Sequence, residues 1–418
     1  MARPRKNAGQ RQESLPIPAE IPVEEQPYAL PEGWKWVRLL STFTNLTDSK
    51  KKLPQKEYVK EGAIPVVDQG QNLIGGYCDK KMLAYEGSLP VIIFGDHTRC
   101  VKYVDFKFIQ GADGIKVLRP HPFFYSKFFY YAIINLSIPN LGYRRHFPLF
   151  HQYNLPLPPL DVQKRIVRHI ESLFVKLDAA KEKAEAVLES FEIRKAAILH
   201  NAFTGELTAK WREEKGIVKI SDTIKINDIL DDIKYGTSEK SDYKYSGVPV
   251  IRIPNIADGK VDLTDLKFLK SSTVSDYDLV KLNDILMIRS NGSRELVGKC
   301  ALVDESIAGK AYASFLIRLR PKSTVIPEFL LAFLNSSDAR NQLFAKAKSS
   351  AGINNINSKE IGAVDILLPN KEEQQEITRI LDDLLEKEQK IKDAAENVLE
   401  RIDLMKKAIL AKAFRGEL

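Results

Sequence analysis

Apolar residues follow a helical spacing in two long stretches of the chain, residues 155–207 and 366–418. They fall at alternating steps of four and three positions over residues 166–198 in the first stretch and 377–409 in the second. A period of 3.5 residues kept for more than four heptads is typical of a coiled coil. Prolines at the start of each stretch and a glycine near its end therefore predict one long helix in each place.

The two stretches are also copies of each other. A shift of 211 positions lays residues 155–207 on residues 366–418 without a gap, and about 22 of the 53 pairs are identical. Three of the matched pairs are Gln163 with Gln374, Ile166 with Ile377, and Phe203 with Phe414. A gapless repeat of this length indicates one structural element used twice.

The apolar stripe of each helix has two interpretations. Each helix could pack into the core of its own neighbouring domain, or the two stripes could bury each other. The faces outside the stripe are rich in charge, as at residues 181–183 and 386–388, so most of each helix is predicted to be solvated. This favours the second interpretation.

Short apolar runs separated by turn residues predict strands in the two segments that flank the first helix, residues 30–154 and 208–365. The same landmarks occur in the same order in both segments. The predicted strands are residues 64–67, 89–96 and 114–120 in the first segment and 247–251, 284–288 and 315–321 in the second. A helix is predicted near residues 123–135. We therefore expect two mixed α/β domains of one fold, joined by two long helices.

The first 29 residues are polar and rich in proline, and they lack an apolar signal-peptide core. They are predicted to be a flexible tail, and the protein is predicted to be cytoplasmic. No stretch is apolar over the length that a membrane span needs. Three widely spaced cysteines fit neither a disulfide framework nor a zinc site.

The charge of the chain favours polyanionic partners. The formal net charge is +8 and the isoelectric point is about 9.0. The chain lacks the Asn-Pro-Pro-aromatic run of amino-methyltransferases, and its glycine-rich segment 292–300 has the wrong spacing for a phosphate loop. The pair Asp96-His97 has no nucleophile motif beside it. Catalysis by this chain alone is therefore not expected.

Polar loops at equivalent places in the two segments are the candidates for base recognition. Arginine can bind guanine and asparagine can bind adenine with two hydrogen bonds in the major groove. The alternative is that these residues only form turns. The candidates are Arg99, Arg144, Arg145 and His146 in the first segment and Ser290, Asn291, Ser293, Arg294, Asn354, Asn355 and Asn357 in the second.

These features together resemble the specificity subunit of type I restriction-modification systems, and the resemblance covers nearly the whole chain. Its most specific parts are the helix start Pro-Leu-x-x-Gln-x-x-Ile at residues 159–166 and the twin endings Phe-x-Gly-Glu-Leu at 203–207 and 414–418. The second helix start departs from this pattern, with Asn370-Lys371 in place of Pro-Leu.

Two versions of the family's target-recognition domain are also similar to segments of this chain. Residues 92–97 with 111–115 look like one version, and residues 288–293 with 351–356 look like another. The resemblance thus makes residues 30–154 and 208–365 the target-recognition domains and the two long helices the spacers between them.

The resemblance implies a non-catalytic DNA-reading subunit. In the family, each target-recognition domain reads half of a split, asymmetric site, and the paired helices fix the gap between the halves. The helices also dock two modification subunits, which bind S-adenosylmethionine, and motor and nuclease subunits that use ATP and magnesium join the complex. No cofactor and no metal are expected in this chain. The docking positions expected here are Gln163, Ile166, Phe203, Gln374, Ile377 and Phe414.

Two domains that face one DNA duplex are related by a pseudo-two-fold axis, so helices that link them are expected to form an antiparallel coiled coil. The segment that ends at Leu418 is then expected near Trp34 and Trp36. Two other functions stay open from the sequence. One is a self-contained DNA methyltransferase or nuclease with atypical motifs, and the other is a coiled-coil adaptor that binds only proteins.

Overall fold

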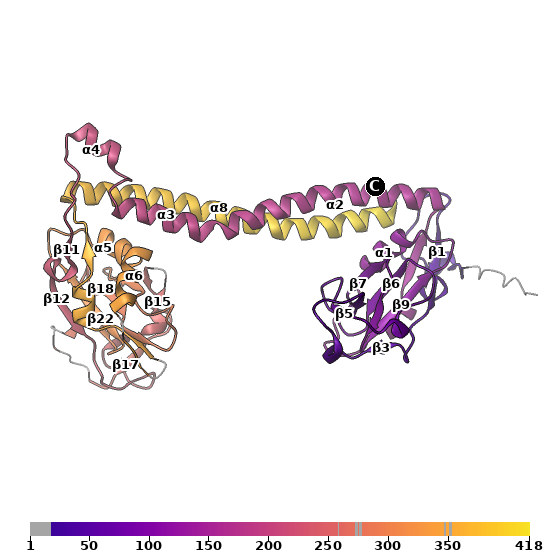
Figure 1. Ribbon diagram of the computed structural model, residues 1–418, viewed down its shortest axis with the longest axis horizontal. Coiled ribbons are helices and arrows are strands. Elements are labelled where there is room, and N and C mark those ends of the chain that lie inside the picture. Colours follow the sequence, from indigo (N-terminus) through magenta and orange to yellow (C-terminus); the bar gives the residue numbers. More distant parts are fainter. Residues whose placement is uncertain (1–17, 258, 272–274, 276–277, 347, 351–352) are drawn as a thin grey trace, which may run out of the picture. The chain divides into compact units, whose positions relative to one another are not determined.

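The computed structural model describes residues 18–257, 259–271, 275, 278–346, 348–350 and 353–418 (Figure 1). The chain divides into two compact units. Unit 1 contains residues 1–184 and 397–418, and unit 2 contains residues 185–396. Each unit therefore combines a globular part with segments of both long helices.

Unit 1 contains two four-stranded sheets. The first is antiparallel, in the order β2 (Phe43–Asn45), β9 (Ile115–Pro120), β6 (Val91–Gly95) and β7 (Val101–Val104). The second has the order β3 (Lys52–Leu53), β8 (Ile109–Gly111), β4 (Ile64–Val67) and β5 (Gly76–Cys78), in which β8 runs parallel to β3 and β4. The short helix α1 (Ser126–Ile134) packs against β6 and β7. A strand pair, β1 (Lys35–Arg38) with β10 (Asn154–Leu157), leads into the first long helix.

Unit 2 repeats this plan. Its first sheet is antiparallel, in the order β12 (Leu230–Tyr235), β22 (Leu316–Pro321), β18 (Ile285–Ile288) and β20 (Cys300–Leu302). Its second has the order β13 (Ser241–Asp242), β17 (Lys267–Leu269), β14 (Pro249–Ile251) and β21 (Ala311–Tyr312), with β14 parallel to β21. Helix α5 (Pro327–Leu334) packs against β20, and β11 (Ile224–Lys225) pairs with β25 (Asp365–Ile366) before the second long helix.

The predicted strands are confirmed in both units. The three runs of the first segment form β4, β6 and β9, and those of the second form β14, β18 and β22. The helix predicted near residues 123–135 is α1. Unit 2 also has further elements. After β14 these are the hairpin β15 (Ile256–Ala257) with β16 (Lys260–Val261), the strands β19 (Ser290–Asn291), β23 (Lys348–Ser350) and β24 (Ile353–Asn355), and the helices α6 (Ser337–Lys346) and α7 (Ser358–Gly362). Helix α4 (Ala209–Lys215) lies before β14 and follows the first long helix.

The second long helix is continuous, as predicted, but the first is divided. Helix α8 runs over Lys371–Arg415, whereas the first copy forms α2 (Leu160–Glu189) and α3 (Phe191–Phe203). Ser190 stands at the break, and its hydroxyl donates to the carbonyl oxygens of Ala186 (2.8 Å) and Val187 (3.1 Å). Such bonds compete with the helical hydrogen bonds, which is why serine inside a helix often bends it.

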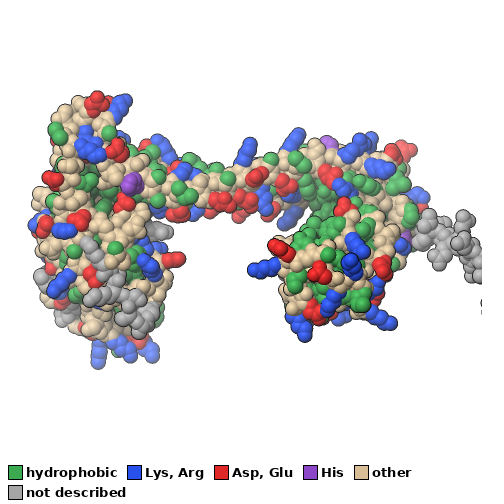
Figure 2. Space-filling model, viewed as in Figure 1, with side chains coloured by type: hydrophobic (Ala, Val, Ile, Leu, Met, Phe, Trp, Pro, Cys, Tyr) green, Lys and Arg blue, Asp and Glu red, His purple; other side chains and the backbone are tan. Residues whose placement is uncertain are grey.

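Each unit packs segments of the two copies against each other in opposite directions. In unit 1 the start of α2 and the end of α8 share one hydrophobic cluster, and Lys406 pairs with Asp178 at 2.5 Å. In unit 2 the end of α3 meets the start of α8, and Arg194 pairs with Glu388 at 2.8 Å. Acidic and basic side chains stand out along the visible surface of the helices in Figure 2.

The two interpretations of the apolar stripe are not exclusive within a unit. Ile166, Ile170 and Phe414 lie in the same cluster as the α1 residues Phe128 and Phe129. The helix ends therefore pack on each other and also on the core of the globular part. Burying an aromatic side chain contributes about 1.5–3 kcal/mol, so this shared cluster holds the helix ends firmly to the unit.

Residues 19–28 were expected to be part of a flexible tail, and this expectation is wrong for them. The N–H of Arg38 donates to Ala19 O (3.1 Å), and the N–H of Ile21 donates to Trp36 O (3.0 Å). These bonds extend the β1 edge, which otherwise would leave its backbone groups unpaired. Residues 1–17 lie outside the described residues.

Candidate nucleic-acid interface

The two candidate loops of unit 1 meet at a buried aspartate. Asp96 follows β6, and its Oδ1 accepts hydrogen bonds from the N–H groups of His146 (2.9 Å) and Phe147 (2.7 Å). Lys116 Nζ lies 3.8 Å from Asp96 Oδ2. Because a buried carboxylate needs such partners, Asp96 fixes the second loop against the end of the sheet.

His146 is fully buried and belongs to the same support. Its Nδ1 lies 2.9 Å from the carbonyl oxygen of Asp96, and its Nε2 lies 3.1 Å from the N–H of Leu141. The ring therefore donates from Nδ1 and accepts at Nε2. In this structure His146 holds the shape of the loop, and its side chain has no surface with which to contact a base.

Beside this support the loop presents exposed side chains. Tyr143 is 88% exposed as a residue, and its ring stacks on that of His97, with ring centroids 4.9 Å apart. Arg144 and Arg145 follow, and both are exposed. Within the described part of the chain, neither arginine forms an ion pair or a side-chain hydrogen bond. Two adjacent uncommitted guanidinium groups suit phosphate and guanine contacts.

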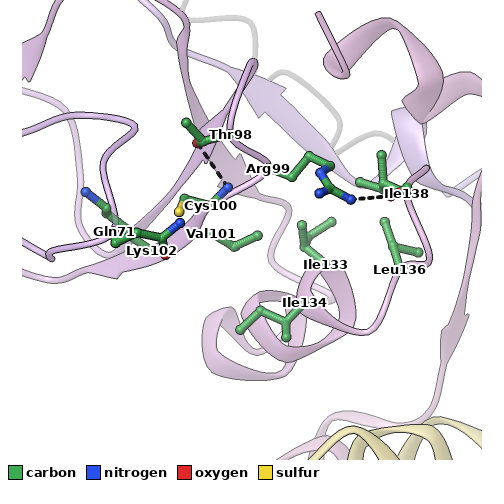
Figure 3. Close-up of a pocket in the computed structure, with 10 residues that line it drawn as sticks. All are labelled: Gln71, Thr98, Arg99, Cys100, Val101, Lys102, Ile133, Ile134, Leu136 and Ile138. Atoms are coloured by element: carbon green, nitrogen blue, oxygen red, sulfur yellow. Dashed lines mark hydrogen bonds between the residues drawn. The ribbon is translucent and has the colours of Figure 1, made fainter. Parts of the chain in front are cut away.

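Arg99 is placed differently from these two arginines. Its backbone is left-handed (φ 60°), and its Nη1 donates to the carbonyl oxygen of Ile138 at 2.9 Å. Figure 3 shows the guanidinium turned toward Ile138, at the edge of a pocket of about 430 Å³ that Ile133 and Leu136 also line. Part of its hydrogen-bonding capacity is thus used within the unit.

Unit 2 brings its candidate loops together through a short sheet. Ser290 and Asn291 of β19 pair with Asn355 and Asn354 of β24, and Asn354 Nδ2 donates to Gly292 O at 3.3 Å. Asn355 is exposed, whereas Ser290 is buried. The result is a surface of small amide and hydroxyl groups where unit 1 presents arginines.

The other two candidates in unit 2 have partners of their own. Arg294 is exposed, and its guanidinium lies 4.8 Å from the centre of the Phe344 ring. Asn357 caps α7, since its Oδ1 accepts from the N–H of Glu360 at 3.0 Å and its own N–H donates to the carboxylate of Glu360. The side-chain carbonyl of Asn357 is therefore already occupied by the cap.

Aromatic side chains beside the candidates did not stand out in the sequence as site residues. Tyr143 directly precedes the candidates Arg144 and Arg145, but only its exposure in the structure marks it. In unit 2, Arg289 lies 4.7 Å from the ring centre of Tyr235 and donates to Ser314 O. Arg340 also lies over Phe344 (5.4 Å), and burial lowers the pKa of its guanidinium. Tyr143 with His97 and Arg289 with Tyr235 are far apart in the chain, so no pattern in the sequence identifies their stacking, whereas Arg340 and Phe344 are four positions apart on α6.

The sequence matches the family model of the type I restriction modification DNA specificity domain over residues 31–190 and 219–401. Together the two matches span most of the chain. The chain belongs to this family.

Relatives named as specificity subunits align with nearly the full length of this chain. The specificity subunit of the type I restriction enzyme EcoKI from Escherichia coli is 29% identical, with 93% of this chain and 90% of the relative covered. That of StySPI from Salmonella potsdam is 26% identical, with the same coverage. Specificity subunits are the non-catalytic members of these enzymes, so the chain is the non-catalytic component of a type I system.

Solved structures support the fold of this specificity subunit. A structure described as the basis of complex assembly and conformational transition of the type I R-M system gives a TM-score of 0.69 at 19% identity. An HsdS subunit from Thermoanaerobacter tengcongensis gives 0.60 at 18% identity. Both comparisons cover 94% of this chain and all of the other chain. The mixed α/β architecture with long helices is therefore that of specificity subunits.

The expected docking positions of this specificity subunit lie in its interior. Gln163 Oε1 accepts from the N–H of Tyr125 (2.7 Å), and its Nε2 donates to the carbonyl oxygens of Phe123 (2.9 Å) and Pro158 (2.8 Å). Gln374 makes the matching three bonds to Ile326, Thr324 and Pro369. The remaining four positions, Ile166, Phe203, Ile377 and Phe414, are also buried. In this conformation all six anchor the helices to their own unit, and their docking role stays a prediction.

The end of α8 lies where it was expected. The hydroxyl of Tyr28 donates to the carbonyl oxygen of Phe414 (3.1 Å), and Trp36 Nε1 donates to the carbonyl oxygen of Tyr28 (3.0 Å). A side chain added at Gly416 would touch Pro31 and Trp34. The prediction that this segment lies near Trp34 and Trp36 is confirmed. Among the described residues, no helix has the length and apolar character needed to cross a bilayer.

Proposed function

We propose that this specificity subunit recognises a split, asymmetric DNA site and that each of its two domains reads one half. Residues 30–154 and 208–365 are the two target-recognition domains in this proposal. The observation that carries it is one scaffold with two different recognition surfaces. The sheet order β2-β9-β6-β7 matches β12-β22-β18-β20, while the loops at the end of each sheet differ in chemistry. Domains with the same loops would read the same bases.

The first half-site is read by arginine and the second by amides in this proposal. Arg144 and Arg145 are free to bind guanine or phosphate, and Asn354 and Asn355 are suited to adenine. Arg99, Ser290, Asn291, Ser293 and Arg294 border these loops and supply further polar contacts. His146 and Asn357 position the loops, because both ring nitrogens of His146 and the Oδ1 of Asn357 are already bonded within the unit.

The two copies of the long helix form an antiparallel coiled coil that sets the gap between the half-sites. Residues 155–207 and 366–418 are these spacers, and they relate the two domains by a pseudo-two-fold axis. The opposite directions of the paired segments inside each unit support this proposal. The positions of the helix ends also support it, because the end of each copy packs on the short helix beside the start of the other copy. The ring centroids of Phe203 and Phe329 of α5 are 5.5 Å apart, and those of Phe414 and Phe128 of α1 are 4.9 Å apart.

The partners in this proposal are double-stranded DNA, two modification subunits and two restriction subunits, all in the cytoplasm. S-adenosylmethionine binds to the modification subunits, and ATP and magnesium bind to the restriction subunits. A docking surface on the helices needs exposed apolar side chains. Val398, Leu404 and Met405 of α8 provide them, since they are 40%, 63% and 47% exposed.

The test is to combine the full chain with its modification subunit and to map every methylated adenine on a DNA library. A two-part motif with a fixed gap is expected. Exchange of residues 30–154 with the matching domain of a relative should change one half of the motif only. A change in both halves, or a single undivided motif, would contradict the proposal. Methylation by the chain without the modification subunit would instead indicate a self-contained DNA enzyme.

A further inference from the structure

The same corner occurs in both units, where a short helix meets the start of a long one. Gln163 accepts from Tyr125 as Gln374 accepts from Ile326. The rings of Phe128 and Phe414 meet as those of Phe329 and Phe203 do. These contacts show which residues are equivalent in the two units. Equivalent residues of α1 and α5 differ by 201 in number, and those of α2 and α8 differ by 211.

In unit 1 this corner is filled by the chain itself. Lys127 of α1 donates to Glu171 of α2 at 2.6 Å. One turn further along α1, the ring of Tyr131 meets the ring of Phe174 edge-on, with centroids 5.8 Å apart. A lysine and an aromatic ring at positions i and i+4 of one helix thus cover the start of α2.

In unit 2 the residues at the four equivalent positions do not fill the corner. Glu328 stands in place of Lys127 and Ala332 in place of Tyr131, while Asp382 and Leu385 stand in place of Glu171 and Phe174. A groove of about 590 Å³ lies there, and all four of these unit 2 residues line it. The lysine has been replaced by a second carboxylate, and two aromatic rings have been lost.

The two carboxylates form no ion pair in the described part of the chain, although Lys195 and Lys299 also line the groove. Neither Glu328 nor Asp382 forms an ion pair or hydrogen bond there. Burial, and then the charge of Glu328, raise the pKa of Asp382. Arg340 also lines the groove, but its guanidinium donates to Glu295 O and lies over Phe344. A cation supplied from outside would relieve the repulsion between the carboxylates.

We propose that this groove of unit 2 docks one modification subunit by receiving a lysine or arginine side chain together with a neighbouring aromatic side chain. These two side chains of the modification subunit would occupy the places that Lys127 and Tyr131 occupy in unit 1. This inference rests on the proposed function, because it takes the modification subunit as the partner. Its consequence is that the two modification subunits are held unequally. The one at unit 2 depends on an ion pair and is released more readily by salt.

Two variants close the groove in different ways. Glu328→Lys places the lysine of unit 1 opposite Asp382, so the chain neutralises its own carboxylate. Ala332→Tyr with Leu385→Phe restores the two aromatic rings and leaves the charges unchanged. Glu372→Lys is the matched control for charge, because Glu372 is an exposed residue in the first turn of α8 and lies outside the groove lining. Circular dichroism and thermal unfolding of each purified variant establish that it is folded.

The experiment is a titration of the full chain with the modification subunit, followed by native mass spectrometry at low and moderate salt. The unaltered chain should bind two modification subunits, one of which is lost first as salt rises. Both groove variants should lower the affinity for one subunit by about tenfold or more and leave the other unchanged. Glu372→Lys should behave as the unaltered chain.

The outcomes distinguish a failure of the groove inference from a failure of the proposed function. If folded Glu328→Lys and the double variant bind two subunits as the unaltered chain does, the groove inference is wrong while the proposed function stands. If the unaltered chain binds no modification subunit, the proposed function fails and the groove inference fails with it.

Discussion

In unit 1 the strands β6 and β9 contain the buried valines Val91 and Val117. The equivalent positions at the matching strands of unit 2, β18 and β22, hold buried charged side chains. Asp284 corresponds to Val91, and Arg318 corresponds to Val117. All four side chains are almost completely inaccessible to solvent. Asp284 forms two 2.7 Å bonds with Arg320, and Arg318 pairs with Asp232. At these matching positions one sheet topology therefore accommodates apolar side chains in one unit and an ionic network in the other.

The comparison shows which features set the fold and which are free to change. Strand order, the buried glutamine at each helix start and the aromatic side chain at each helix end are shared by both units. Core chemistry, the recognition loops and the corner beside α1 or α5 differ. The shared features attach the helices to the sheets, so they keep the two surfaces in equivalent positions while each surface changes independently.

The largest effect is expected from breaking the ionic network of unit 2. Asp284→Ala removes both bonds to Arg320, while Arg318 keeps its pair with Asp232. Removing one partner of a buried ion pair typically costs about 3–5 kcal/mol. Val91→Ala in unit 1 removes two methyl groups and should cost about 1–3 kcal/mol. Hydrogen exchange measured separately for peptides of each unit checks this, because two units need not unfold as one. Equal loss of protection in both variants would contradict the contrast.

The next effect tests the feature that the units share. Gln163→Ala and Gln374→Ala each remove three hydrogen bonds and leave a buried N–H and two carbonyl oxygens without partners. One such group costs about 1–3 kcal/mol, so each variant should lose at least this much, and the two losses should be similar. The exposed neighbour Gln375→Ala is the control and should change stability by about 0.5 kcal/mol or less. Denaturant unfolding followed by hydrogen exchange distinguishes the two units.

A smaller effect should separate the recognition surfaces. Arg144→Ala or Arg145→Ala should weaken recognition by about 1–3 kcal/mol at one base position, because a bidentate contact is lost. Asn355→Ala should act on the other half-site only. Methylation of DNA libraries with substitutions in either half, measured with the modification subunit present, gives both results. If every variant weakened both halves equally, separate reading would be refuted.

The smallest effect concerns the corner of unit 2. The pKa of Asp382 is raised in the folded chain, so folding disfavours its charged form. Stability is therefore unaffected at pH values below the unfolded pKa, near 3.8, and is lost as pH rises through the folded pKa. Asp382→Asn should be slightly more stable than the unaltered chain near neutral pH, and the difference should vanish in acid. Thermal unfolding from pH 3.5 to 7 measures it, and a difference of the opposite sign would contradict this assignment.

Much of the scaffold could be predicted because it depends on local periodicity. Runs such as residues 91–95 read as buried strands, and the gapless repeat placed Gln374 and Phe414 in the same role as Gln163 and Phe203. The heptad spacing was less informative about burial. Val398 and Met405 lie on the predicted stripe but are almost half exposed, since a pair of helices covers only a narrow seam.

The candidate loops were located more accurately than the roles within them. The pairing of residues 290–291 with 354–355 and the link from Asp96 to His146 bring the expected segments together. The sequence could not show that His146 is enclosed or that Asn357 caps a helix. The burial of His146 depends on its bonds to Asp96, 50 residues away, which form only after distant segments have met. The Asn357 cap is a local bond to Glu360, but a polar residue in a loop has the same appearance whether it caps a helix or contacts DNA.

The crossed helix ends determine the order in which the chain can finish folding during synthesis. Unit 2 is one uninterrupted segment, residues 185–396, so all of it is translated before the last turns of α8. Unit 1 needs Leu410, Ala413 and Phe414 for its hydrophobic cluster. The half of the molecule that is translated first is thus the half that is completed last, and until then its α1 face stays uncovered for any chaperone to bind.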